Sequence, residues 1–180
     1  MDVPWRKGKE EQERGSTSRV RPAEVEEVRR LVDRLRQEDP AASIGIITFY
    51  KDQALRIARR LGVGLGEGDD LRVGTVDAFQ GRQFDAVILS TVRANEMRGI
   101  GDKARGARIG FLALRNRLCV AMSRARKLLV VVGCKETTAG IGAGGRADAA
   151  GVSDGACWQL ANFYTELCDR KPVNLPTGAS

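Results

Sequence analysis

The sequence predicts an α/β fold in which a mostly parallel central sheet is covered by helices on both faces. Short apolar runs of the length of buried strands alternate along the chain with segments whose apolar residues recur at helical spacing. The last run, Leu128–Val132, is apolar throughout, as is typical of a parallel strand buried on both faces. Strands and helices that alternate in this way build a sheet with a helical layer on each side.

The first elements are a strand remnant, a loop and a helix. Asp2–Trp5 resembles the end of a strand and Arg6–Arg21 is polar, so we expect residues 1–15 to be a truncated strand and a polar loop. Pro22 suits the first position of a helix, and glutamates fill the first turn. Helical spacing continues to Gln37, and Asp39-Pro40 ends the helix.

The middle of the chain repeats strand and helix. Predicted strands cover residues 44–50, 71–76, 85–92 and 128–132, and predicted helices cover residues 54–61 and 114–125. Four glycines between residues 62 and 68 indicate a flexible connection, and residues 94–109 a long loop.

The C-terminal part is expected to close the same domain. One domain body covers residues 1–135, and residues 136–156 are rich in Gly and Ala, which predicts a flexible loop. Apolar residues at helical spacing predict a closing helix over 157–171, and residues 172–180 are expected to be a disordered tail.

Composition limits the class of protein. The chain has 180 residues, enough for one domain with a real core, and a net charge of +7. Such a charge favours polyanionic partners, but an ordinary basic surface would also account for it. Because the chain has neither a run of about 20 apolar residues nor a signal peptide, we expect an intracellular protein, cytoplasmic or nuclear/nucleoid.

Histidine is absent, and the four cysteines form no Cys-x-x-Cys pair. The sequence therefore predicts no metal site and no catalytic triad that depends on an imidazole. Free thiols in a reducing compartment fit the cysteines better than a zinc site does.

Two segments carry residues suited to a phosphate-bearing ligand. The turn from Thr75 to Gln83 joins two predicted strands, and Gly81 permits close backbone approach there. In the later helix, Arg117 and Arg124 lie two turns apart, and guanidinium groups bind phosphate oxygens bidentately. Taken singly, either segment is also explained as an ordinary polar turn or a solvated helix face.

A third segment ends the first strong strand. Thr48, Phe49, Tyr50 and Lys51 place a hydroxyl, two aromatic rings and a cation at the mouth of the sheet, which suits a sugar–phosphate backbone. The alternative is that the two aromatic residues belong to the core.

A complete nucleotide site is missing. The sequence has no Gly-x-x-x-x-Gly-Lys-Ser/Thr to hold β- and γ-phosphates, and no Asp-Glu pair ends a buried strand to hold magnesium. We therefore expect that this chain alone does not hydrolyse ATP.

In order and spacing, the three segments resemble helicase motifs. Ile44–Gln53 is similar to motif IV, Val76–Gln83 to motif V and Arg117–Arg126 to motif VI. Together they resemble the second, C-terminal RecA-like domain of superfamily 1 helicases, an AAA-type helicase domain of the group that contains senataxin and the nonsense-mediated-decay helicase. The similarity spans roughly residues 16–133 and continues weakly into the predicted closing helix.

The resemblance implies a RecA-like three-layer sandwich with the P-loop NTPase fold, and a function as half of an ATP-dependent motor. ATP with Mg²⁺ would be held mainly by a first, Walker-bearing RecA-like domain, and single-stranded DNA or RNA would be the other partner. By motif match, Arg124 would be the arginine finger, and the residues at the nucleotide would be Gly81, Gln83 and Arg117. The residues near the nucleic-acid strand, or coupling that strand to the nucleotide cleft, would be Thr48, Tyr50, Thr75 and Asp77.

Three departures from the family pattern leave other functions open. Gln83 stands where the family usually has Glu, Phe49 where it has Pro, and Cys119 where it has Asn. Gln83 keeps an acceptor oxygen but loses the charge, so a hydrogen bond there would be weaker. The alternatives are a catalytically inactive nucleic-acid-binding module with the helicase fold, and a protein-interaction domain with an incidental basic surface.

Overall fold

Four parallel strands form the central sheet of the computed structural model, which describes residues 1–95 and 109–138. The strands are β3 (Ile44–Thr48), β4 (Leu71–Thr75), β5 (Phe84–Ser90) and β6 (Ala125–Val132). Their order in the sheet is β4-β3-β5-β6, and each neighbouring pair is parallel. The predicted α/β class with a parallel sheet is confirmed, and the arrangement is that of a RecA-like fold.

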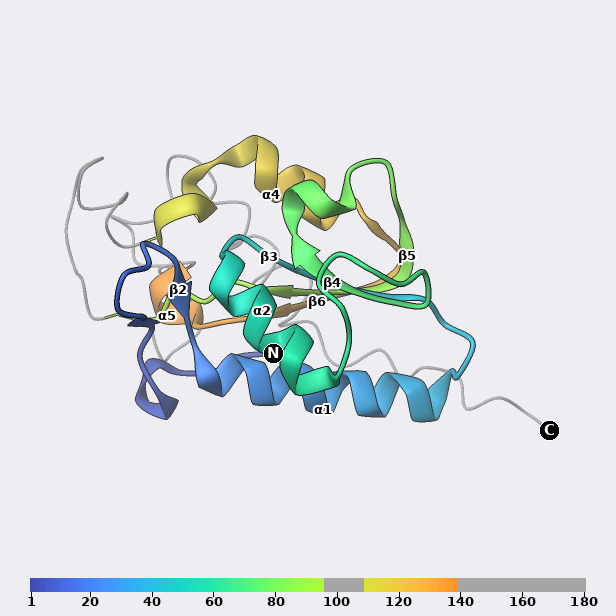
Figure 1. Cartoon of the computed structure of the whole chain (residues 1–180), viewed down its shortest axis with the longest axis horizontal. Coiled ribbons are helices and arrows are strands. Elements are labelled where there is room, and N and C mark those ends of the chain that lie inside the picture. The colour runs from blue at the N-terminus through green and yellow to red at the C-terminus, as the bar shows by residue number, and fades with distance from the viewer. Residues whose placement is uncertain (96–108, 139–180) are drawn as a thin grey trace.

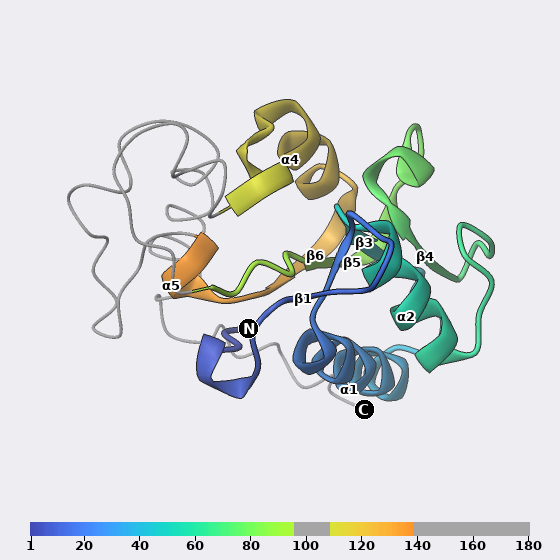
Figure 2. The same ribbon diagram turned by 60° about the vertical axis from the view of Figure 1, so that its left-hand side comes forward.

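Helices cover both faces of the sheet (Figures 1 and 2). On one face lie α1 (Pro22–Glu38) and α2 (Lys51–Leu61), and on the other lies α4 (Arg115–Met122). Short 3₁₀ turns, η2 (Val76–Phe79) and η3 (Gly110–Ala113), extend the α4 layer. Among the described residues, 1–95 and 109–138, no helix is both long and apolar enough to cross a membrane.

Strand alternation divides the core into two halves. Ile44 and Ile46 of β3 point toward α1 and α2, where Val28 and Ile57 are buried with them. Ile47 points to the other face and is buried in the cluster that includes Leu118 of α4. The sheet is therefore apolar on both sides, as the uninterrupted strand sequences predicted.

The helix ends follow from the sequence. Pro22 is the first residue of α1, as predicted, and the helix ends before Pro40. Gly62 follows α2 with φ of +70°, a left-handed conformation that glycine adopts without the strain of a side chain.

Several predicted boundaries differ from the structure. The predicted loop Arg6–Arg21 contains the 3₁₀ turn η1 (Trp5–Lys7) and an antiparallel hairpin of β1 (Glu11–Gln12) and β2 (Arg19–Val20). Of the predicted strand remnant, only Asp2 pairs, in parallel with Gly133. The predicted flexible loop begins as a short helix, α5 (Lys135–Thr138). Two-residue strands and single turns are too short to show any hydrophobic period.

Other predictions fall on residues that the structure does not describe. They are the rest of the Gly/Ala-rich loop to residue 156, the closing helix 157–171, the tail 172–180 and most of the loop 94–109.

Two glycines in the sheet allow the segment after β4 to lie against the α4 face. A methyl group at Gly45 would come within 2.9 Å of the Phe84 ring and 3.0 Å of the Phe79 ring. One at Gly74 would come within 2.9 Å of the Ala78 side chain. Phe79 and Phe84 pack edge to face, with ring centroids 5.4 Å apart. Packing against glycine thus fixes how closely this segment approaches the sheet.

Gly45→Ala is expected to lower the free energy of unfolding by about 1–3 kcal/mol, because the added methyl group overpacks two buried rings. Urea denaturation of the chain measures the change. Phe84→Leu in the Gly45→Ala background removes ring atoms near the methyl group, so the two substitutions should be less harmful together than their sum. Strictly additive losses would show that the close contact is not the cause.

Candidate nucleotide-facing site

The segment between β4 and β5 crosses one face of the sheet, from the ends of the strands to their starts. It leaves β4 at Thr75, passes through η2, turns at Gly81 and enters β5 at Phe84. Gly81 has φ of +75°, which favours glycine, and its α-carbon faces open space. The residues from Gln80 to Gln83 are exposed, so their polar groups are accessible to a ligand.

Helix α4 is joined to both ends of this segment. At the strand ends, Arg117 Nη2 lies 3.2 Å from Asp77 Oδ2. At the strand starts, the backbone N–H of Phe84 donates to the carbonyl of Arg124 over 3.0 Å. The structure therefore brings Arg124 next to the Gly81–Gln83 turn, whereas Arg117 lies at the opposite end of the helix.

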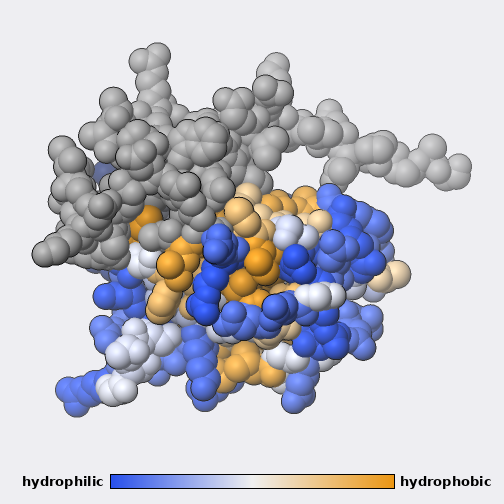
Figure 3. All heavy atoms as spheres, turned by 90° about the horizontal axis from the view of Figure 1, so that it is seen from above, coloured by the Kyte–Doolittle hydropathy of each residue, from blue (hydrophilic) through white to orange (hydrophobic). Residues whose placement is uncertain are grey.

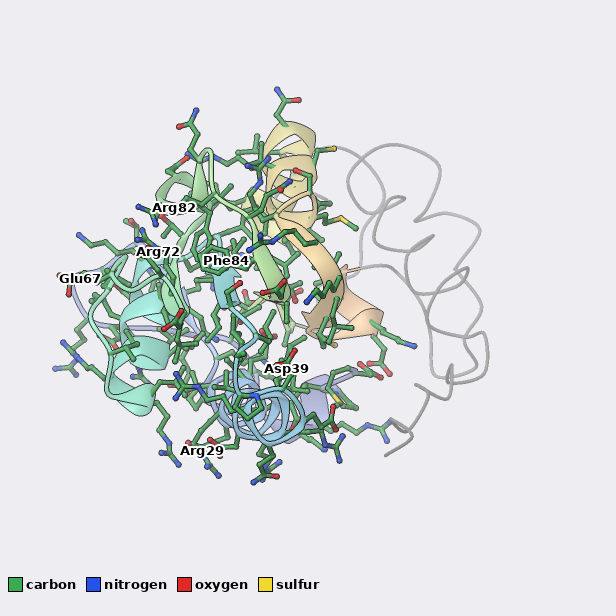
Figure 4. The ribbon with its side chains drawn as sticks, turned by 90° about the vertical axis from the view of Figure 1, so that its right-hand side faces the viewer. Arg29, Asp39, Glu67, Arg72, Arg82 and Phe84 are labelled. Atoms are coloured by element: carbon green, nitrogen blue, oxygen red, sulfur yellow. The ribbon has the colours of Figure 1, made fainter. Side chains whose placement is uncertain are left out.

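Figure 4 faces the edge at which the strands begin. Phe84, Arg82 and Arg72 all lie at that edge. Helix α1 also ends on this side of the molecule, at Asp39. Arg82 donates to Asp69 over 2.6 Å, which ties the turn to the glycine-rich connection before β4. The Arg82–Asp69 contact thus holds the turn, while the residues of the turn stay exposed.

The side chain of Arg124 is half-buried at the C-terminal end of α4. Its Nε donates to the carbonyl of Val120 and its Nη2 to Ser123 Oγ, each over 3.0 Å. It is not among the residues of the hydrophobic core. A guanidinium in this position remains available to a charge on the solvent side.

Sequence reasoning missed a polar cluster at the strand starts. Ser43 donates to the carboxylate of Asp85 through its N–H (3.1 Å) and its Oγ (2.8 Å), and Lys127 Nζ lies 3.2 Å from the same carboxylate. The Ser43 hydrogen bonds, with Lys127 beside them, lower the pKa of Asp85 to about 2. Arg126 donates to the carbonyl of Gln83 over 3.2 Å. These contacts fix the entry to β5, immediately after the turn.

The four residues predicted to lie near nucleic acid differ in exposure. Thr48 and Tyr50 are buried, Thr75 is half-buried and Asp77 is exposed. Tyr50 packs against Phe111 with ring centroids 5.5 Å apart, and burial raises its pKa. Of the two interpretations left open for the aromatic residues at this strand end, the structure supports the core, because Phe49 and Tyr50 are both buried.

The α4 layer, which carries the candidate site, has a mixed surface. Figure 3, seen from the α4 side, shows apolar areas divided by hydrophilic side chains. The exposed large apolar residues of the described chain are Met1, Phe111, Leu114 and Leu128. Within residues 1–95 and 109–138, no three or more Asp, Glu, Cys or His side chains are grouped as metal ligands would be.

Comparison with known proteins places the chain in a family. Residues 1–136 match the model of the AAA domain family. The chain is 40% identical over 109 residues to "Probable helicase senataxin" of Homo sapiens, which covers 61% of this chain and 4% of that protein. It is 38% identical over 117 residues to "DNA polymerase alpha-associated DNA helicase A" of Saccharomyces cerevisiae, covering 64% and 16%.

A third relative is "Regulator of nonsense transcripts 1 homolog" of Neurospora crassa, 37% identical over 149 residues, with 74% of this chain and 13% of that protein covered. The chain thus spans less than a fifth of the length of each of these relatives. It belongs to the AAA domain family, as a superfamily 1 helicase domain of the senataxin and nonsense-transcript-regulator group.

Proposed function

We propose that this chain is the second, C-terminal RecA-like domain of an ATP-dependent helicase, and that Arg124 is its arginine finger. The observation that supports this most is the contact of Arg124 with the start of β5, directly after the Gly81–Gln83 turn. A cation, an amide side chain and exposed backbone then share one edge of the sheet. Such an edge can form one wall of a nucleotide cleft.

The residues fit only one side of that cleft. Arg124 offers positive charge that stabilises the phosphoryl group during transfer, and Gln83 offers a neutral hydrogen-bonding group. The sequence contains no Walker A motif, and the described residues contain no group of acidic ligands for magnesium. ATP with Mg²⁺ would therefore be held mainly by a Walker-bearing domain in another segment or chain.

Single-stranded nucleic acid is the proposed second partner. Asp77 and Lys51 are exposed at the ends of β4 and β3, and the chain carries a net charge of +7. The relatives include one named for DNA and one named for nonsense transcripts, so either nucleic acid remains a candidate. The ion pair of Asp77 with Arg117 supports coupling of the strand ends to α4.

A second candidate function is that of an inactive nucleic-acid-binding module. Gln83 favours this candidate, because it is exposed and neutral at a position where the family usually has a charged Glu. Binding to single-stranded oligonucleotides that weakens steeply with salt would be common to both candidates, and its absence would favour a protein-interaction domain. Only the first candidate predicts an effect on ATP turnover.

Reconstitution of ATPase activity tests the proposal. The chain alone is expected to show no turnover, and a Walker-bearing RecA-like domain is expected to gain turnover when this chain is added or fused. The Walker-bearing domain alone is the control. Turnover by the isolated chain that Arg124→Ala abolishes would contradict the proposal, and no gain on mixing or fusion would favour the inactive module.

A further inference from the structure

The end of α4 presents several backbone carbonyls with no partner inside the helix. Ser123 follows the last helical residue, and its backbone N–H bonds to the carbonyl of Cys119 over 3.0 Å. The carbonyl of Val120 has no such backbone partner, and it accepts from Ser123 Oγ and from Arg124 Nε, each over 3.0 Å. Ser123 and Arg124 therefore satisfy this carbonyl with their side chains.

The hydroxyl of Ser123 also contacts the guanidinium directly. It accepts a hydrogen bond from Arg124 Nη2 over 3.0 Å while it donates to Val120. One donor and one acceptor site of the hydroxyl are then used, and the three groups form a closed ring. Such a ring restricts the rotation of a long side chain whose terminal torsions would otherwise be free.

The ring uses only one edge of the guanidinium. Nε and Nη2 form the side edge of the planar group, and both bond to the end of α4. The other edge consists of Nη1 and the second N–H of Nη2, and the described residues supply no hydrogen-bond partner for Nη1. Guanidinium binds phosphate oxygens through two parallel N–H groups, which this free edge provides.

We infer that Ser123 is a positioning residue, which together with the Val120 carbonyl holds Arg124 so that the end of its guanidinium faces the ligand. The inference rests on the proposed function, because it assigns an orientation to the proposed arginine finger. Arg124 is the group that would touch the phosphate, and Ser123 acts only through it. A preset orientation removes the need to order the side chain during the reaction.

The first test is made on the full chain without any partner. The Nε and Nη signals of Arg124 are assigned by NMR from their loss in Arg124→Lys. Native chain and Ser123→Thr should show a separate, slowly rotating Nη2 signal, whereas Ser123→Ala and Ser123→Val should lose it. Thr17→Ala, which removes an exposed hydroxyl in the turn between β1 and β2, is the matched control and should leave the signal in place.

The second test uses a helicase that contains this domain and its Walker-bearing partner. Ser123→Ala and Ser123→Val are expected to lower kcat by up to about 10²-fold, the range for a slightly misplaced catalytic group. KM should stay nearly constant, and Ser123→Thr should keep the activity. A merely structural hydroxyl would lower the melting temperature without this selective loss of kcat.

The two tests separate the possible failures. If Ser123→Ala leaves the Arg124 signals unchanged, or if Ser123→Ala matches the native kcat, Ser123 does not position Arg124 and the inference is overturned. If the Arg124 signals respond to Ser123 but Arg124→Ala leaves ATP turnover unchanged, the proposed function fails, and the orientation of Arg124 then has no role in catalysis.

Discussion

Arg124→Ala is expected to lower kcat for ATP hydrolysis by about 10³-fold or more in a helicase that contains this domain and a Walker-bearing partner. In the proposed role, the guanidinium of Arg124 would stabilise the charge on the transferred phosphoryl group from across the cleft. In this structure the side chain of Arg124 is half-buried at the end of α4. Its Nε bonds to the carbonyl of Val120, so the guanidinium is held in place outside the core. Steady-state ATPase kinetics measure the loss.

The pattern of the loss identifies the role. Arg124→Lys keeps the charge but cannot donate through two parallel N–H groups, so most of the loss should remain. Arg34→Ala removes an exposed cation on α1, on the opposite face of the sheet, and should leave kcat unchanged. An increase in KM with constant kcat would mean that Arg124 only binds nucleotide, which would contradict the role of an arginine finger.

Local patterns predicted the main elements because each depends on residues close in sequence. The strand at residues 44–48 and the helix that begins at Pro22 follow from apolar spacing and from proline chemistry. The family resemblance also depended on continuous stretches, and the match over residues 1–136 confirms it.

Long-range contacts could not be predicted in this way. Ser43 and Asp85 are 42 residues apart, and neither belongs to a pattern that would pair them. Tyr50 is buried and its ring packs against that of Phe111, which lies far from it in the sequence. An aromatic residue at a strand end fits a core and a stacking surface equally well until the segments that pack around it are known.

The role of Gly45 shows the same limit. Gly45 lies inside a strand, where glycine is unfavourable. The sequence alone does not indicate why a glycine stands there. Only the packed structure shows that the rings of Phe79 and Phe84 occupy the space of the missing side chain. The polar turn that carries Gly81 is therefore placed by apolar packing several residues away.

The second large effect is expected at a buried ion pair between Arg21 and Glu24. Both side chains are fully buried, with Nη1 3.0 Å from Oε1. Glu24 also accepts from Ser90 Oγ (2.7 Å) and from the N–H of Val92 (3.0 Å). Arg21 donates in turn to the carbonyls of three N-terminal residues, Val3, Pro4 and Gly8, over 2.7 to 2.9 Å. The pair joins the N-terminus, α1 and the end of β5.

Arg21→Met is expected to lower the free energy of unfolding by about 3–5 kcal/mol, because it leaves a buried carboxylate without its cation. That is a large part of the roughly 5–15 kcal/mol by which proteins are stable. Urea denaturation at neutral pH measures the loss. A change below about 1 kcal/mol would show that water reaches Glu24 and that the pair contributes little.

The loss should depend on pH. Burial raises the pKa of Glu24 above its ordinary value of 4.5, although Arg21 opposes the shift. In Arg21→Met this opposition is gone, so the pKa rises further. A carboxyl group with a raised pKa in the folded state stabilises the fold in its protonated form. That stabilisation is present below pH 4.5 and is lost as the pH rises through the folded-state pKa. The difference between native chain and variant should therefore shrink toward acid pH, and taking the difference cancels the other carboxylates.

Arg21→Met/Glu24→Gln separates the charge from the hydrogen bonds. The amide introduced at position 24 would be neutral and would still accept from Ser90 and Val92, so part of the stability at neutral pH should return and the added pH dependence should disappear. If the double variant is as unstable as Arg21→Met, the loss arises instead from the carbonyls of Val3, Pro4 and Gly8, which neither variant satisfies. The pair would then serve mainly to hold the N-terminal residues against the sheet, with Glu24 as support for the guanidinium.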